Sequence, residues 1–171
     1  MHKINLHSDI IPGKSAAGLD LGINFSEIND LITNPIQWKR EDGQVQSVIL
    51  NESEWIFVPT RINNSSPDSP HINGRYYYNF GSIELNFNSS GDLVLIALSN
   101  KYKGLFLNSI GIGDKLSKVE DFFKLTYDDI EELHYPSVNS GISGIIFQAE
   151  ECSLEESPNQ DIYRIIVERS I

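Results

Sequence analysis

The strongest constraint on the fold is a pair of strand-like segments separated by a short run of turn-forming residues. Residues 83–87 have the sequence Ile-Glu-Leu-Asn-Phe, and this alternation of apolar and polar side chains is typical of a half-buried strand. Residues 88–92, Asn-Ser-Ser-Gly-Asp, favour a turn, and residues 93–98 are almost entirely apolar. Together the three segments predict an antiparallel β-hairpin with one face in the core.

Four further segments have the composition of strands. They are residues 45–50, 54–59, 144–150 and 162–168, and the last two flank a loop that contains Pro158 and Asn159. No sequence repeat with a period of about 20 to 50 residues is present. We therefore expect an α+β fold in which two or three short helices pack on one face of an antiparallel β-sheet. The order of the strands does not follow from the sequence.

Two segments combine a helix start signal with helical apolar spacing. In the first, Asn24 and Glu27 have the spacing of a capping box, and Pro35 ends the segment. In the second, Ser117 and Glu120 have the same spacing. The apolar stripes are Phe25, Ile28, Leu31 and Ile32 in the first segment and Leu116, Val119, Phe122 and Phe123 in the second. We predict a helix in each segment, with the stripe facing the core.

The length of the chain indicates a single domain spanning residues 1–171. A chain of this size buries about 70% of its unfolded surface and needs no disulfide or metal to fold. The polar residues 63–70, with three Ser and two Pro, predict a mobile loop inserted in that domain. The N-terminal segment has no apolar signal core, no apolar run approaches about 18 residues, and Cys152 is the only cysteine. We expect a cytoplasmic location, because these features fit a reducing compartment.

The negative charge of the chain is concentrated in one stretch. The formal net charge is −11, and residues 114–161 hold 12 acidic against 3 basic residues, a balance of −9. The rest of the chain holds 12 acidic against 10 basic residues, a balance of −2. A local field of one sign attracts a partner of opposite charge and repels nucleic acid, which is a polyanion. The alternative interpretation is that the acids only keep the domain soluble.

Two glycine-containing segments imitate nucleotide-binding motifs. Residues 12–15, Pro-Gly-Lys-Ser, resemble the end of a phosphate-binding loop, but that loop requires a glycine where Ser8 stands. Gly111 and Gly113 lack the third glycine of a dinucleotide fingerprint, because position 116 is Leu116. We interpret both segments as turns, and we expect no cofactor.

Two side chains with catalytic or metal-binding chemistry occur in the acidic stretch. Cys152 lies among Glu150, Glu151, Glu155 and Glu156, and these carboxylates should raise the pKa of its thiol. His134 with Glu131 forms one Glu-x-x-His step, whereas a dinuclear carboxylate site requires two such steps and further Glu residues. We therefore expect neither a catalytic residue nor a metal site.

Aromatic residues precede the hairpin. Tyr76, Tyr77 and Tyr78 are consecutive, so in a strand at least one ring faces away from the core. Tyrosine, tryptophan and arginine are enriched at protein interfaces. Together with Trp55 and Arg75, these tyrosines are a candidate protein-binding patch. Packing in the core is the alternative.

Two longer segments carry a family resemblance. Residues 11–22 (Ile-Pro-Gly-Lys-Ser-Ala-Ala-Gly-Leu-Asp-Leu-Gly) and 102–123 (Tyr-Lys-Gly-Leu-Phe-Leu-Asn-Ser-Ile-Gly-Ile-Gly-Asp-Lys-Leu-Ser-Lys-Val-Glu-Asp-Phe-Phe) make up about a fifth of the chain. With their turn glycines and helix start signal, they resemble immunity proteins of bacterial contact-dependent growth inhibition systems. The resemblance implies a small cytoplasmic α+β protein that binds and blocks the C-terminal toxic domain of an effector, often a nuclease. Such immunity proteins use different surfaces for different toxins, so the resemblance assigns no binding residue.

We therefore expect a non-enzymatic inhibitor of a cationic toxin domain, because an acidic protein can cover the basic residues with which a nuclease holds phosphates. A general binding module with an acidic solvating face and an enzyme with an unrecognised site are the alternatives. We expect no nucleic acid and no membrane as a partner. The predicted contact residues are Asp121, Asp128, Asp129, Glu131, Glu132, Glu150, Glu151, Glu155, Glu156, Trp55, Tyr76, Tyr77 and Tyr78.

Overall fold

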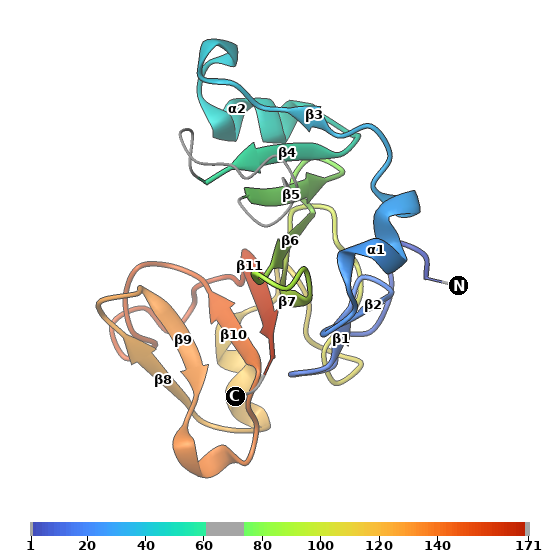
Figure 1. Ribbon diagram of the computed structural model, residues 1–171. Coiled ribbons are helices and arrows are strands. Elements are labelled where there is room, and N and C mark those ends of the chain that lie inside the picture. The colour runs from blue at the N-terminus through green and yellow to red at the C-terminus, as the bar shows by residue number, and fades with distance from the viewer. Residues whose placement is uncertain (1, 61–73, 170–171) are drawn as a thin grey trace.

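A computed structural model describes residues 2–60 and 74–169, and one large β-sheet dominates it (Figure 1). The nine strands of this sheet lie in the order β3-β4-β5-β6-β7-β11-β10-β9-β8. All neighbouring pairs are antiparallel except β3 and β4. The strands are β3 (Ile36–Gln37), β4 (Ile56–Pro59), β5 (Gly74–Tyr78), β6 (Ile83–Phe87), β7 (Leu93–Ser99), β8 (Leu125–Asp128), β9 (Leu133–Pro136), β10 (Ile145–Gln148) and β11 (Arg164–Glu168). The strands β1 (Ser15–Ala16) and β2 (Leu19–Asp20) form a separate two-stranded sheet.

The hairpin predicted from the alternating segment is confirmed. Strands β6 and β7 pair antiparallel from Ile83 opposite Leu98 to Phe87 opposite Leu93, with an irregularity between Asn86 and Phe87. In the turn, the Asn88 carboxamide oxygen accepts hydrogen bonds from the backbone N–H groups of Ser90 and Asp92, both at 2.9 Å. Asparagine favours turns because its side chain can bond to the backbone two residues on.

The expectation of a largely antiparallel sheet is also confirmed, and three more predicted segments contain strands. These are β4 in residues 54–59, β10 in residues 144–150 and β11 in residues 162–168. Strands β8 and β9 form a hairpin within the acidic stretch that the sequence analysis did not predict. The polar segment 63–70, predicted as a loop, lies outside the described residues.

The first predicted helix is confirmed at its start and is short. Helix α1 (Phe25–Ile28) begins with the predicted capping box of Asn24 and Glu27 and continues as the 3-10 helix η1 (Asn29–Leu31). The second predicted segment is the 3-10 helix η4 (Leu116–Asp121), and it begins one residue before Ser117 without a side-chain cap. Phe122 was predicted to face the core with the rest of the apolar stripe but is 51% exposed, so the prediction is wrong for this residue.

The prediction of a strand at residues 45–50 is wrong. This segment is helix α2 (Val45–Asn51). The reason is visible in the spacing of Val45, Val48 and Ile49, which are the least exposed residues of the helix and recur at i, i+3 and i+4. Two further 3-10 helices are η2 (Arg40–Asp42) and η5 (Val138–Ser140).

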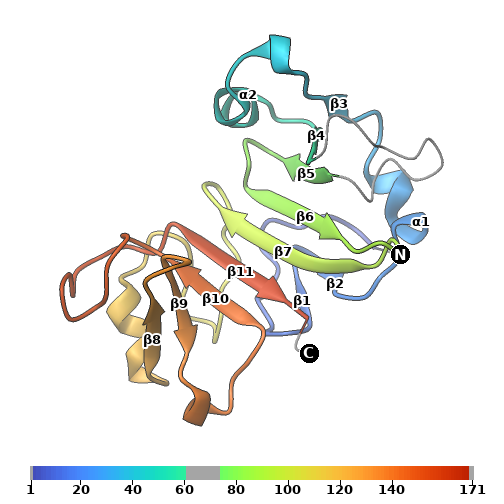
Figure 2. The same cartoon turned by 60° about the vertical axis from the view of Figure 1, so that its left-hand side comes forward.

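The large sheet has two different faces. The inner face carries Ile83, Leu85, Ile96 and Leu98 of the central hairpin and packs into the main core together with α1 and the two-stranded sheet. The outer face carries a smaller buried cluster of Ala97, Ile146 and Ile166. Helix α2 lies on the outer-face side and α1 on the opposite side, so the helices do not share one face as predicted (Figure 1). Figure 2 shows α2 and the β8–β9 hairpin at opposite ends of the sheet.

Candidate functional site

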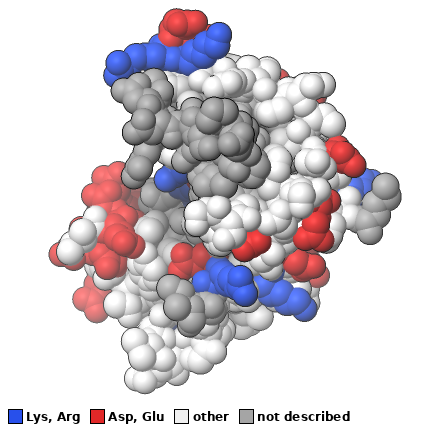
Figure 3. Space-filling model, in the orientation of Figure 1, with Lys and Arg blue, Asp and Glu red and all other residues white. Residues whose placement is uncertain are grey.

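Two acidic segments that are separate in the sequence meet at one end of the sheet. The turn between β8 and β9 carries Asp128, Asp129, Glu131 and Glu132, and the loop between β10 and β11 carries Glu150, Glu151, Glu155 and Glu156. We call these eight residues the acidic surface. Figure 3 shows acidic side chains gathered on the left-hand side of the molecule, where this turn and this loop lie in Figure 1.

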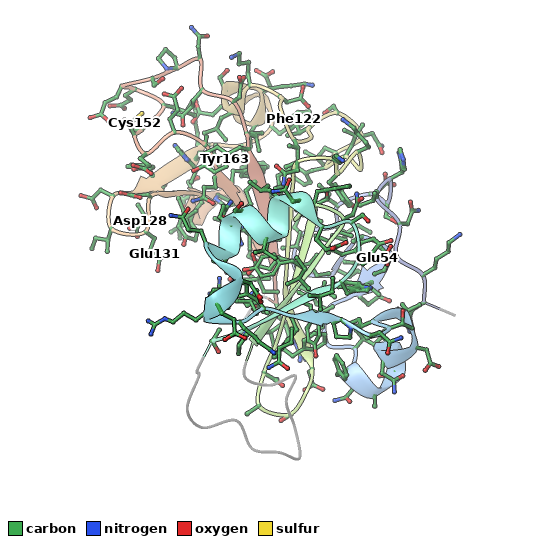
Figure 4. All side chains as sticks on the ribbon, turned by 90° about the horizontal axis from the view of Figure 1, so that it is seen from above. Glu54, Phe122, Asp128, Glu131, Cys152 and Tyr163 are labelled. Atoms are coloured by element: carbon green, nitrogen blue, oxygen red, sulfur yellow. The ribbon has the colours of Figure 1, made fainter. Side chains whose placement is uncertain are left out.

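Tyr127 and Tyr163 show how close the two segments are. Burial raises the pKa of the Tyr127 phenol, and the carboxylates of Glu132 in the turn and Glu151 in the loop raise it further. Burial likewise raises the pKa of Tyr163, again with contributions from Glu151 and Glu132. Each phenol therefore lies near acids from both segments. In Figure 4, Asp128, Glu131 and Cys152 accordingly lie on the same side, whereas Glu54 lies across the molecule.

The turn between β8 and β9 holds its acids in a defined conformation. The Asp128 carboxylate accepts hydrogen bonds from the backbone N–H groups of Glu131 and Ile130, each at 2.9 Å, and these bonds lower the pKa of Asp128. Glu132 has a φ of +58°, in the left-handed region that residues other than glycine seldom adopt. Backbone strain of this kind costs on the order of 1 kcal/mol and is often found at functional sites.

Buried Gln160 fixes the loop between β10 and β11. Its side-chain nitrogen donates to the backbone carbonyls of Ser157 at 2.9 Å and of Cys152 and Ser153 at 3.3 Å. The Glu150 carboxylate also accepts a hydrogen bond of 2.8 Å from the Ser157 hydroxyl. The four exposed acids of this loop are therefore held by an ordered backbone.

An exposed apolar side chain lies among the acids. Ile130 is 88% exposed between Asp129 and Glu131 at the tip of the turn. Strand β8, which leads into this turn, is one edge of the large sheet. Apolar anchors surrounded by polar residues are common in protein interfaces, and an edge strand can pair with a strand of a partner.

The remaining predicted contact residues do not join the acidic surface. Asp121 is exposed at the end of η4, which precedes β8, whereas the acidic turn follows β8. Trp55 and Tyr76 are 3% and 5% exposed in the main core, so the prediction that they contact a partner is wrong. The Tyr78 ring packs on Trp55 with centroids 4.8 Å apart, again on the inner face. Tyr77 points to the outer face, as does Arg75, because alternate residues of a strand point to opposite faces.

The outer face contains a groove that the sequence analysis did not predict. It has a volume of about 460 Å³ and lies between α2 and Tyr163, with Arg75, Tyr77, Glu84 and Arg164 among its lining residues. A weak signal was present, because Arg75 and Tyr77 are alternate residues of one strand, and Glu84 is a charged residue on the polar side of the alternating strand that follows. Glu84 is only 6% exposed.

The side chains with catalytic or metal-binding chemistry are kept apart. His134 points to the inner face and is 1% exposed, with its ring 4.8 Å from that of Tyr127, while Glu131 bonds to the Tyr135 hydroxyl. Burial lowers the pKa of His134, and a backbone group of Cys152 partly opposes this. Burial and the carboxylates of Glu150 and Glu156 raise the pKa of the Cys152 thiol. Within the described residues, no group of three or more His, Cys, Asp or Glu side chains is arranged to hold a metal ion.

The two segments with nucleotide-motif glycines form turns, as predicted. Pro12, Gly13 and Lys14 form the turn that leads into β1, and the Gly13 N–H donates to the Gly144 carbonyl at 2.9 Å. The Gly111 N–H donates to the Asp114 carboxylate at 2.7 Å, and the Gly113 N–H donates to the Ile162 carbonyl at 2.7 Å. These N–H groups are engaged within the protein.

Comparisons with known proteins show one structural likeness. No family model and no curated protein sequence matches the chain. The chain is similar to the crystal structure of the uncharacterized protein yfeY from Escherichia coli, with 14% sequence identity and a TM-score of 0.45. The match covers 81% of this chain and 92% of the other. Within residues 2–60 and 74–169, no helix has the length and apolar character needed to cross a bilayer.

Proposed function

We propose that this protein is a cytoplasmic immunity protein that binds the cationic toxic domain of a contact-dependent growth inhibition effector and blocks it. The acidic surface covers the basic residues with which the toxin, often a nuclease, holds the phosphates of its substrate. Inhibition is by occlusion and needs no chemical step in the immunity protein.

The single observation that carries the proposal is the meeting of two acidic segments around Tyr127 and Tyr163. From Leu125 to Tyr163 the sequence contains no Lys or Arg, so no cation from this stretch neutralises the acids. Surface acids distributed for solubility are usually interspersed with bases. A region of one sign instead speeds encounter with an oppositely charged partner and selects against others.

The geometry of the turn supports the same function. Hydrogen bonds accepted by the Asp128 carboxylate and donated by the Gln160 side chain order the backbone of both segments, so little conformational entropy is lost when a partner binds. Ile130 offers an apolar anchor within the acids, and β8 is an edge strand of the sheet among the described residues, so it can pair with a strand of the toxin. We expect the acids to set the association rate and Ile130 to set the dissociation rate.

The first test is genomic and inexpensive. The neighbouring gene should encode a large secreted effector with a basic C-terminal domain, and that domain should co-purify with this protein. A neighbouring gene product without such a domain would count against the proposal.

The second test measures rates. Two variants neutralise the acidic surface, one at Asp128, Asp129, Glu131 and Glu132 and one at Glu150, Glu151, Glu155 and Glu156, with each Asp changed to Asn and each Glu to Gln. Surface plasmon resonance against the toxin domain should show slower association and a weaker salt dependence for both variants, because steering acts on the on-rate.

A matched control separates local charge from net charge. Neutralising Asp20, Asp30, Glu41 and Glu54, which are exposed residues outside the acidic surface, changes the net charge by the same amount. This control should retain an association rate close to that of the wild-type protein. Equal slowing by all three variants would show that net charge, and not the acidic surface, sets the association rate. No slowing by any variant would show that the acidic surface serves only solvation.

A further inference from the structure

A groove on the outer face of the sheet is lined by other residues than the eight of the acidic surface. The groove between α2 and Tyr163 has a volume of about 460 Å³, within the range of about 300 to 1,000 Å³ that is usual for small-molecule sites. Among the described residues that line it, two are cationic, Arg75 and Arg164, and one is anionic, Glu84. The groove thus carries a local charge of +1 in a protein whose net charge is −11.

The carboxylate of Glu84 is already paired by other groups of the floor. Its Oε2 accepts a 2.5 Å hydrogen bond from Arg164 Nη2, and its Oε1 accepts one of 3.1 Å from the Asn86 carboxamide. Arg164 reaches Glu84 across β7, where Ala97 and Ser99 are small and line the groove between them.

Within the described residues, the groove has one cation in excess, and Arg75 is the more exposed and the more weakly paired of its two arginines. Arg75 Nη1 lies 3.4 Å from Glu84 Oε1, which is longer than an ordinary hydrogen bond, and the Arg75 side chain is 49% exposed. A guanidinium has five N–H donors in a planar fork that matches a carboxylate. A side-chain hydrogen bond with Tyr77, two residues along the same strand, orients the guanidinium.

Part of the groove lining is apolar. Helix α2 contributes Val45, Ile49 and Leu50, and Leu50 is 44% exposed although it is a large apolar side chain. An apolar lining with a single cation in excess is the usual arrangement for an organic ligand with one polar end.

We propose that this groove binds a small organic monocarboxylate, with its carboxylate on Arg75 and its apolar body against α2. A monoanion matches the single surplus charge. Polyanions such as nucleoside phosphates are disfavoured, because the negative charges of Glu132 and Glu151 lie near Tyr163, which lines the groove, and would repel further negative charge. The apolar body distinguishes the ligand from a bare inorganic anion.

The test uses phenylacetate as the probe and the neutral phenylacetamide as its matched control. Each is titrated to about 10 mM into the 15N-labelled full chain in a Tris chloride buffer, and amide shifts are followed by two-dimensional NMR. Phenylacetate should shift amides of α2, β5 and residues near Tyr163. The affinity for phenylacetamide should be lower by a factor of about ten or more, because phenylacetamide lacks the charge that Arg75 recognises.

Two variants assign the effect to the groove. Arg75→Gln should weaken phenylacetate roughly tenfold or more, whereas Arg169→Gln, the same charge change at an exposed arginine outside the groove lining, should change the affinity by less than about twofold. The wild-type spectrum without ligand should be retained by both variants outside the mutated site. Equal binding of acid and amide, no shifts in the groove, or an unaffected Arg75→Gln variant would each overturn the proposal.

Discussion

The buried pair of Glu84 and Arg164 gives the sharpest prediction about stability. The Glu84 side chain is 8% exposed, and Arg164 Nη2 is 2.5 Å from its Oε2. Replacing Arg164 by Met keeps the apolar stem of the side chain but removes the charge. Oε2 then loses its partner, and Oε1 retains the Asn86 amide and the long contact to Arg75.

Breaking a buried ion pair by removing one partner destabilises a protein by about 3 to 5 kcal/mol. We expect the lower end, about 3 kcal/mol, because Arg75 and Asn86 still face the carboxylate. For a chain of this size each kcal/mol lowers Tm by about 2 to 4 °C, so Arg164→Met should melt about 6 to 12 °C below the wild type. Urea denaturation should show a lower midpoint with an unchanged slope.

A double variant and a control complete the experiment. In the variant with both Glu84→Gln and Arg164→Met, no buried charge is left unpaired, so the loss should be clearly smaller than the sum of the two single losses. Arg75→Gln should cost less than about 1 kcal/mol, because that contact is long and half exposed. Additive losses, or an Arg164→Met variant within about 0.5 kcal/mol of the wild type, would show that Glu84 and Arg164 do not stabilise each other.

Three other changes have definite expected outcomes. Glu132→Asn should raise Tm by about 2 to 4 °C in differential scanning calorimetry, because asparagine tolerates the left-handed conformation better; a lower Tm would contradict this. Tyr102→Phe should lower the free energy of unfolding by about 1 to 3 kcal/mol in urea denaturation, because the buried hydroxyl accepts a hydrogen bond from Ala17 N–H and donates one to the Ser8 carbonyl. An unchanged free energy of unfolding would show that water replaces the hydroxyl. Because the pKa of His134 is lowered in the folded protein, the unfolded chain binds the proton at a higher pH, and the stability of the wild type should fall as pH drops below 6.5. The His134→Phe variant should lack this loss of stability. Parallel stability–pH profiles of wild type and variant would contradict the expectation.

The sequence predicted those parts of the fold that local spacing determines. The β6–β7 hairpin followed from alternation and turn residues, and the start of α1 followed from Asn24 and Glu27. Helix α2 was mispredicted because its β-branched residues have strand propensity, while its packing on the sheet determined the outcome. The β8–β9 hairpin was missed because only four residues form each strand and polar side chains interrupt them.

The candidate sites depend on contacts between distant residues, and this limits what the sequence can predict. The concentration of acids in residues 114–161 was visible, but the convergence of the turn and the loop depends on the pairing of β9 with β10. The burial of Trp55 and Tyr76 depends on which face of β4 and β5 meets the core. The pairing of Glu84 with Arg164, 80 residues apart, carries no local signal.

Under the proposed function, a cationic partner binds at the acidic surface. Hydrogen exchange of the free protein and of its complex with the basic toxin domain can locate this contact. We expect slower exchange on binding for amides of residues 127–134 and 149–157, with α2 and the β1–β2 hairpin unchanged. Protection confined to other surfaces, with exchange in these two segments unaltered, would contradict it.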